Sequence, residues 1–169
     1  MNLTVDIADY KTTDDPSAVL TTYSLGSCIG VTIWDPERRI GGMIHYMLPD
    51  SGIDRNKADR NPYMFADTGV AALVRRFREM GGSAQRLTVR AAGGANVLDG
   101  GGHFNIGKRN FLALRKVLWK AGLMIHSQNV GGSNSRTVSL EVSTGRLLWK
   151  ESNGTEGELL VGGRGRGGG

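Results

Sequence analysis

Two residues that can carry out covalent catalysis lie near the start of the chain. Cys28 is the only cysteine, and His45, one of three histidines, follows it seventeen residues later. A cysteine attacks a carbonyl carbon as its thiolate, and an adjacent imidazole can hold that thiolate as an ion pair and later protonate a leaving amine. The pair is therefore a candidate nucleophile and general base.

The turn between two expected strands brings these residues together. The segment CIGVTIW alternates apolar residues, DPER is a turn, and IGGMIHYML returns as a second strand. A hairpin symmetric about DPER places Cys28 directly opposite His45, with their Cβ atoms about 4.5–5.5 Å apart. A bulge at Gly41 and Gly42 would shift this register.

The segment before the cysteine offers further groups for the same chemistry. Gly26, in the turn LGS, permits backbone angles that leave peptide N–H groups free, so the amides of Ser27 and Cys28 are candidate oxyanion donors. Hydroxyl groups that could orient the His45 ring belong to Thr21, Thr22, Ser24 and Ser27. The residues alone leave open a second interpretation, in which Cys28 is a small buried hydrophobe.

The remaining composition excludes several classes of site. One cysteine and three scattered histidines lack the spacing of metal ligands, so we expect no metal and no cofactor. We interpret His103, in a glycine-rich loop, and His126, in a strand, as structural or solvent-facing. A single cysteine cannot form an internal disulfide, which favours a reducing, cytoplasmic location. The start MNLTVDIADY resembles no secretory signal, and no apolar run reaches the roughly 18 residues that membrane insertion requires.

The length and charge favour one domain with a polar tail. The chain has 169 residues and a net charge of +5. We expect a single domain over 1–150 and a flexible Gly/Arg-rich tail over 151–169, which ends in VGGRGRGGG. The basic residues are dispersed and suit an acidic protein partner. RNA binding through two tail arginines is a weaker alternative, and we expect no nucleic-acid partner.

The order of the expected elements indicates an α+β fold with mixed sheets. One helix should begin after Asn61, with Pro62 at its first position, and end at Gly81; another should span about 106–121. Residues 50–61 are polar and are predicted to form a loop. Strands are predicted at 3–7, 18–23, 28–34, 40–48, 86–92 and 123–130, with a hairpin over 136–150.

A set of short motifs resembles the CheD family, the chemoreceptor glutamine deamidases. In order, the chain carries LGSC, DP, IGGM, a histidine, MLP, GGAN, IGKRN, NVGGSNSR and TGR, from about residue 20 to 150. Each motif is unspecific alone, but their order is typical of the family. Val97 and Leu98 depart from the Met-Phe that many members carry, which bears on substrate or partner contacts.

The resemblance implies an activity and a set of roles. Members are cysteine hydrolases that convert selected glutamines in the cytoplasmic helical bundle of methyl-accepting chemotaxis receptors to glutamate. The family's catalytic Thr, Cys and His match Thr22, Cys28 and His45, and so single out Thr22 as the residue that orients the histidine. The family fold packs mixed sheets flanked by helices, as in deamidating toxins. Some members bind a CheC-type phosphatase, and a cytoplasmic place at receptor arrays is implied.

Three alternatives remain open at this point. The chain could be another Cys-His amide hydrolase, such as a peptidase. It could be a non-enzymatic adaptor that binds a receptor or a CheC-type phosphatase and keeps the dyad as scaffold. RNA binding through the tail is the third.

Overall fold

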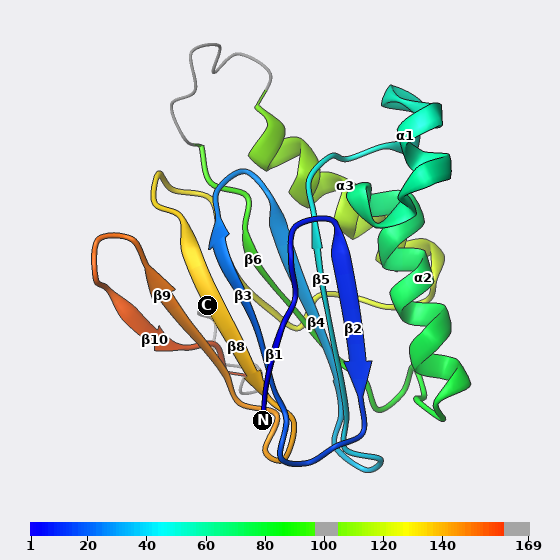
Figure 1. Ribbon diagram of the computed structural model, residues 1–169, viewed down its shortest axis with the longest axis vertical. Helices are drawn as coiled ribbons and strands as arrows, with labels where there is room; N and C mark the ends of the chain where they lie inside the picture. The colour runs from blue at the N-terminus through cyan, green and yellow to red at the C-terminus, as the bar shows by residue number, and fades with distance from the viewer. Residues whose placement is uncertain (97–104, 161–169) are drawn as a thin grey trace.

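Two stacked β-sheets with helices on one outer face form the molecule (Figure 1). The structure is a computed structural model that describes residues 1–96 and 105–160. Its elements in chain order are β1 (Asn2–Thr4), β2 (Asp9–Thr13), β3 (Val19–Leu25), β4 (Ile29–Asp35), β5 (Ile40–Tyr46), η1 (Ser51–Ile53), α1 (Arg55–Arg60), η2 (Pro62–Met64), α2 (Ala66–Glu79), β6 (Thr88–Gly93), α3 (Ile106–Lys120), β7 (Ser127–Val130), β8 (Arg136–Glu141), β9 (Leu147–Glu151) and β10 (Glu156–Glu158).

Both sheets are mixed, so the predicted α+β class with packed mixed sheets is confirmed. The first sheet has the strand order β1-β3-β8-β9-β10, and the second has the order β2-β5-β4-β6-β7. Each contains one parallel pair, β1 with β3 and β6 with β7, and the other pairs are antiparallel. Helices α2 and α3 cover the second sheet on the face away from the first (Figure 1).

The central strands β4 and β5 are buried on both faces because they lie between two cores. Ile29, Val31 and Ile33 pack against the helices, whereas Met43 packs with residues of the first sheet. The pair Gly41-Gly42 forms no bulge and pairs regularly with Ile33 and Trp34. A Cβ at Gly41 would lie 2.8 Å from Val142, so this glycine lets the two sheets approach closely.

The helical region after β5 differs from the prediction. The expected loop over 50–61 contains η1 and α1, because the side chains of Asp50 and Asp54 accept hydrogen bonds from Gly52 N and Lys57 N and cap these short helices. Asn61 does act as an N-cap, but only for η2. The extended backbone of buried Phe65 separates η2 from α2, which ends near the predicted Gly81.

Two further strands lie where none was expected. The polar segment DYKTT forms β2, which pairs with β5 along the edge of the second sheet. The expected domain end at residue 150 falls inside the first sheet, because β9 ends at Glu151 and β10 pairs with it. Beyond β10, Arg90 Nη1 donates to Leu159 O at 2.9 Å. His103, Val97, Leu98 and the tail over 161–169 lie outside the described residues.

None of the helices between residues 1 and 96 or 105 and 160 combines the length and apolar character needed to cross a membrane.

Candidate active site

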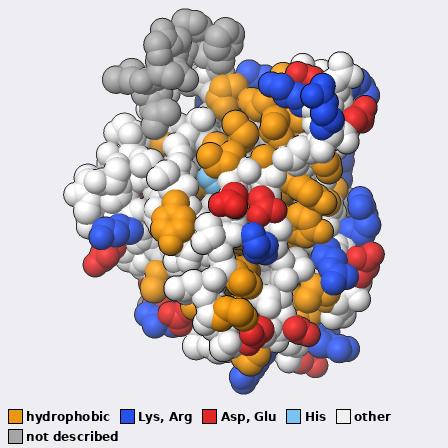
Figure 2. All heavy atoms as spheres, in the orientation of Figure 1, with side chains coloured by type: hydrophobic (Ala, Val, Ile, Leu, Met, Phe, Trp, Pro, Cys, Tyr) orange, Lys and Arg blue, Asp and Glu red, His pale blue; other side chains and the backbone are white. Residues whose placement is uncertain are grey.

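The residues predicted to act together lie at one end of the stacked sheets. The turn from β3 to β4, the end of β5 and the start of α3 meet there (Figure 1). Cys28 is in the β3–β4 turn, immediately before β4, and is half-buried. His45 is the last residue but one of β5 and is 1% exposed. Figure 2 shows hydrophobic side chains gathered over the upper part of the same view.

The predicted pairing of Cys28 directly with His45 is wrong. His45 pairs with Gly30, and the strand pairing ends at Asp35 with Ile40. The turn is centred one residue later than predicted because the Asp35 side chain accepts hydrogen bonds from the next amides, those of Glu37 at 2.9 Å and Arg38 at 3.1 Å. Cys28 is thereby diagonal to His45.

The diagonal arrangement still leaves both groups on one face. The register differs from the predicted one by two residues, and side chains alternate with a period of two, so the face is unchanged. Diagonal neighbours in an antiparallel pair lie about 7–8 Å apart, within reach of long side chains. Gly30 adds no side chain between the strands: a Cβ there would lie 3.0 Å from Leu25 and 3.4 Å from Thr22.

Thr22 fixes the proton position on the His45 ring. Its Oγ1 donates a hydrogen bond to Val5 O at 2.7 Å and lies 2.7 Å from His45 Nδ1. A hydroxyl has one proton, so Oγ1 must accept at Nδ1, which therefore carries the ring proton. The lone pair is then on Nε2, which is buried and has no hydrogen-bond partner among the described residues.

The other candidate hydroxyls have different roles. Thr21 Oγ1 is hydrogen-bonded to Ser139 Oγ at 2.9 Å, on the neighbouring strand β8. Nothing in the described residues links the Ser24 or Ser27 hydroxyl to His45. Of the four hydroxyls that the sequence offered, Thr22 is the one that reaches the ring.

Burial favours the neutral forms of both candidate catalytic groups. Desolvation lowers the pKa of His45 to about 4, and the carboxylate of Asp6 opposes this only in part. Burial also raises the pKa of the Cys28 thiol, with a smaller opposing effect from its own backbone N–H. The free protein therefore holds a thiol and a neutral imidazole, whereas the sequence had suggested a thiolate–imidazolium pair.

Three hydrogen bonds hold the turn that carries Cys28. The carbonyls of Gly26 and Cys28 accept from Ala95 N and Gly94 N, each at 2.8 Å. The third, at Ser27 O, is a side-chain hydrogen bond from α3, at 2.9 Å. The N–H groups of Ser27 and Cys28 donate to no carbonyl in the described part of the chain, so they are candidate donors to an oxyanion; the Cys28 N–H also favours the thiolate of its own side chain.

The first glycine of the GGAN motif lies directly against the turn that carries Cys28. Gly93 has a φ of +108°, and a Cβ on it would lie 2.3 Å from Cys28 O. Only glycine can occupy such a position. The motif therefore packs against the cysteine turn, which requires a glycine at position 93.

Asn110 is a site residue to which the sequence reasoning assigned no role. It is 0% exposed, and its Nδ2 donates to both Ser27 O and Met47 O at 2.9 Å. The backbone carbonyl of Asn110 accepts from Tyr46 Oη at 2.6 Å. Asn110 thus ties the Cys28 turn to the strand end that carries His45. The helical pattern indicates only that a buried amide on this face needs hydrogen-bond partners; it does not reveal the two distant carbonyls that Asn110 reaches.

His126 has a structural hydrogen bond, and the described residues contain no cluster of metal ligands. His126 Nδ1 accepts from Val89 N at 3.0 Å, so this histidine holds two chain segments together away from Cys28. In the described residues no group of three or more His, Cys, Asp or Glu side chains is arranged to hold a metal ion.

Comparison with known proteins agrees with the motifs and the fold. Residues 47–151 match the family model described as CheD chemotactic sensory transduction. The chain is 54% identical over 156 residues to a probable chemoreceptor glutamine deamidase CheD of Solibacter usitatus, covering 92% of each. It is 42% identical to one from Syntrophus aciditrophicus (92% of this chain, 97% of the relative) and 38% identical to the chemoreceptor glutamine deamidase CheD of Thermotoga maritima (92% and 96%). These relatives span Cys28 and His45 as well as the matched segment, and the chain belongs to the CheD family.

Proposed function

We propose that this protein deamidates glutamine side chains of chemoreceptors, with Cys28 as nucleophile, His45 as general base and acid, and Thr22 as the residue that orients the histidine. The supporting observation is the chain of hydrogen bonds from Val5 O through Thr22 to His45 Nδ1, which leaves the Nε2 lone pair free. A general base needs such a lone pair on the side of the nucleophile.

The reaction begins from neutral groups. As Cys28 Sγ attacks the carboxamide carbon of the glutamine, its proton passes to His45 Nε2, and the carbonyl oxygen becomes an oxyanion. The N–H groups of Ser27 and Cys28 donate to that oxyanion. The low pKa of His45 makes its protonated form more acidic than an ordinary imidazolium, which suits it to protonate the leaving nitrogen.

The second half of the reaction releases ammonia and glutamate and regenerates the free thiol. Ammonia departs when His45 gives its proton to the amide nitrogen, leaving a γ-glutamyl thioester on Cys28. His45 then removes a proton from water, whose oxygen attacks the thioester carbon. The C–S bond breaks, the sulfur regains the proton, and the receptor side chain leaves as glutamate.

The thiol and the imidazole are not hydrogen-bonded in the free protein. Catalytic hydrogen bonds are often long without substrate and shorten in the complex. In the complex the attack of Sγ on the amide carbon is coupled to transfer of its proton to Nε2, so the contact between thiol and imidazole is needed only when substrate is bound.

The biological setting is part of the same proposal. The protein acts in the cytoplasm, at or near receptor arrays, on the cytoplasmic domains of methyl-accepting receptors. A CheC-type phosphatase is a candidate second partner. The relatives carry the name chemoreceptor glutamine deamidase, which supports this substrate class.

The decisive experiment uses a purified cytoplasmic receptor fragment from the same genome. Ammonia release is measured, and mass spectrometry maps glutamines converted to glutamate. We expect conversion by the unmodified protein and none by Cys28→Ala or His45→Ala, each checked for native circular dichroism. Cleaved backbone instead of converted glutamines would indicate a peptidase, and a stable complex without conversion would indicate an adaptor.

A further inference from the structure

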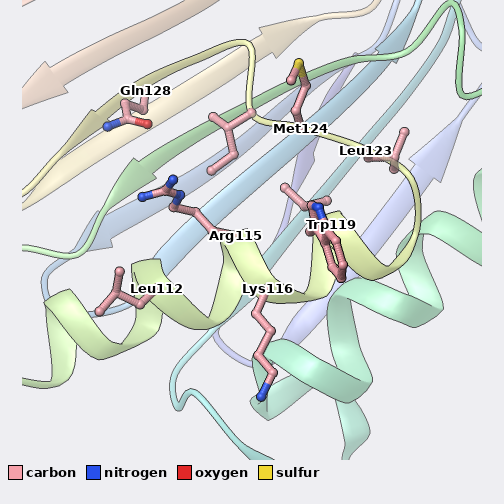
Figure 3. A pocket seen from close by; sticks show the side chains of 9 residues that line it. Leu112, Arg115, Lys116, Trp119, Leu123, Met124 and Gln128 are labelled. Atoms are coloured by element: carbon pink, nitrogen blue, oxygen red, sulfur yellow. The ribbon is translucent and has the colours of Figure 1, made fainter.

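A second surface, distinct from the Cys28 turn, runs along α3. A groove of about 610 Å³ separates α3 from the segment that leads into β7 (Figure 3). Large apolar side chains on it are exposed to solvent: Trp119 is 80% exposed, Met124 69% and Leu112 48%. Exposed apolar side chains gathered around a hollow are typical of a surface that binds a partner.

The same helix carries unbalanced positive charge. Residues 106–120 contain no Asp or Glu, and the basic residues of α3 are Lys108, Arg109, Arg115, Lys116 and Lys120. None of the five forms an ion pair with the residues that the structure describes. Arg115 and Lys116 line the groove beside Trp119 (Figure 3). The apolar groove is therefore bordered by unpaired cations.

We propose that this groove docks an acidic, amphipathic helix of the receptor, apart from the glutamine that is deamidated; the proposal rests on the proposed function. Trp and Arg are the side chains that most often dominate binding energy at protein interfaces. A helix that places its apolar side chains against Trp119 and its carboxylates against Arg115 and Lys116 satisfies both features of the surface.

The position of the groove suits a substrate contact. α3 starts beside the catalytic turn, where Asn110 donates to Ser27 O. Trp119 is nine residues further along, which at a rise of 1.5 Å per residue corresponds to about 14 Å. A continuous α-helix of about ten residues spans that length, so in this proposal one helical partner contacts the groove while a glutamine of the same bundle reaches Cys28. Docking at the groove would then increase affinity without taking part in the chemistry.

The groove also distinguishes this partner from other anionic ones. A membrane surface or a nucleic acid would bind the five cations by charge. Neither kind of binding depends on a groove next to an exposed Trp and Met. A protein helix uses both, since its side chains enter the hollow.

The test compares two α3 variants with a matched control. Lys116→Glu and Trp119→Ala alter exposed side chains of the groove. Arg39→Glu makes the same charge change in the β4–β5 turn, where Arg39 is also exposed. The probe is the purified cytoplasmic receptor fragment. Kd is measured by fluorescence anisotropy with the Cys28→Ala background, and kcat and KM are measured with the otherwise unmodified protein.

We expect Lys116→Glu and Trp119→Ala to raise Kd and KM about tenfold or more and to leave kcat at saturation unchanged. Arg39→Glu should leave all three constants close to the starting values. Unchanged Kd and KM in both α3 variants, while the unmodified protein deamidates the fragment, would refute the docking surface alone. Absence of any deamidation by the unmodified protein would refute the proposed function instead.

Two further probes test the excluded partners. Vesicles of phosphatidylglycerol and phosphatidylcholine, and a short DNA duplex, are titrated under the same salt conditions. We expect neither to compete with the receptor fragment. Displacement of the fragment by either probe, lost in Lys116→Glu, would assign the groove to that partner and overturn the proposal.

Discussion

Replacement of Thr22 by valine tests how the histidine is prepared for catalysis. Thr22→Val keeps the shape of the side chain and removes Oγ1, and with it the hydrogen bonds to Val5 O and His45 Nδ1, both 2.7 Å long. The imidazole then has no acceptor for the Nδ1 proton. In the neutral ring that proton can move to Nε2, which puts a donor where the thiol needs an acceptor.

The magnitude follows from what is lost. A general base in the correct tautomer contributes about 10²–10⁴-fold to rate, so we expect kcat to fall by about that factor. Thr22 is 0% exposed, and the buried carbonyl of Val5 loses its donor, which costs about 1–3 kcal/mol of unfolding free energy. Thr22→Ser retains the oxygen and should recover most of the activity.

The assay separates chemistry from folding. Urea unfolding gives the stability cost, ammonia release from the receptor fragment gives kcat, and ¹⁵N NMR of the histidine ring reports which nitrogen carries the proton. We expect the proton on Nδ1 in the unmodified protein and in Thr22→Ser. A folded Thr22→Val protein with undiminished kcat would refute the role assigned to Thr22.

Three further predictions concern the buried groups of the site. Asn110→Ala removes the donors to Ser27 O and Met47 O, so we expect the free energy of unfolding in urea to fall by about 2–4 kcal/mol. We also expect a lower kcat with an unchanged Kd for the receptor fragment. An unchanged kcat would contradict the positioning role. Because the pKa of His45 is about 4 when folded and about 6.5 when unfolded, the unfolded state binds more protons between these values. Stability should therefore fall by up to about 3 kcal/mol as pH drops from 6.5 to 4, and a similar slope in His45→Gln would show that another group is responsible. Because burial raises the pKa of Cys28, iodoacetamide should alkylate it slowly at pH 7 and faster as pH rises beyond about 8.5; rapid alkylation at pH 6 would indicate a thiolate.

Much of the site could be predicted because it depends on local patterns. The alternation in β4 and the return strand β5 placed the sulfur and the imidazole on one face, and that face survives a register change of two residues. The end of α2 near Gly81 and the span of α3 could be predicted for the same reason, since 3.6-residue periodicity and terminal glycines are local features of the sequence.

What the sequence concealed depends on contacts between distant segments. The exact register follows from how the Asp35 side chain caps its own turn, a choice between neighbouring turn geometries. Strand β2 is polar and is held by pairing with β5, so it carries no apolar alternation. The function of Asn110 depends on two carbonyls more than sixty residues away in the chain, which no local pattern reveals.

The downward shift of the His45 pKa was equally hidden. A histidine in a strand gives no sign of whether its ring is solvated, and here the second sheet and the first close over it. The consequence is chemical: the dyad stays neutral until a substrate arrives. That arrangement keeps the thiol less reactive toward unrelated electrophiles.

The most direct measurement is the covalent state of Cys28 during turnover. The protein is mixed with a receptor peptide that contains a modified glutamine position, quenched in acid within the first turnovers, and analysed by intact mass and peptide mapping. A γ-glutamyl thioester requires an adduct on Cys28 equal in mass to the peptide less one ammonia, sensitive to hydroxylamine and absent from Cys28→Ala. Glutamate formation that continues in Cys28→Ala, with no adduct on the unmodified protein at any time, would contradict the assignment of Cys28 as the nucleophile.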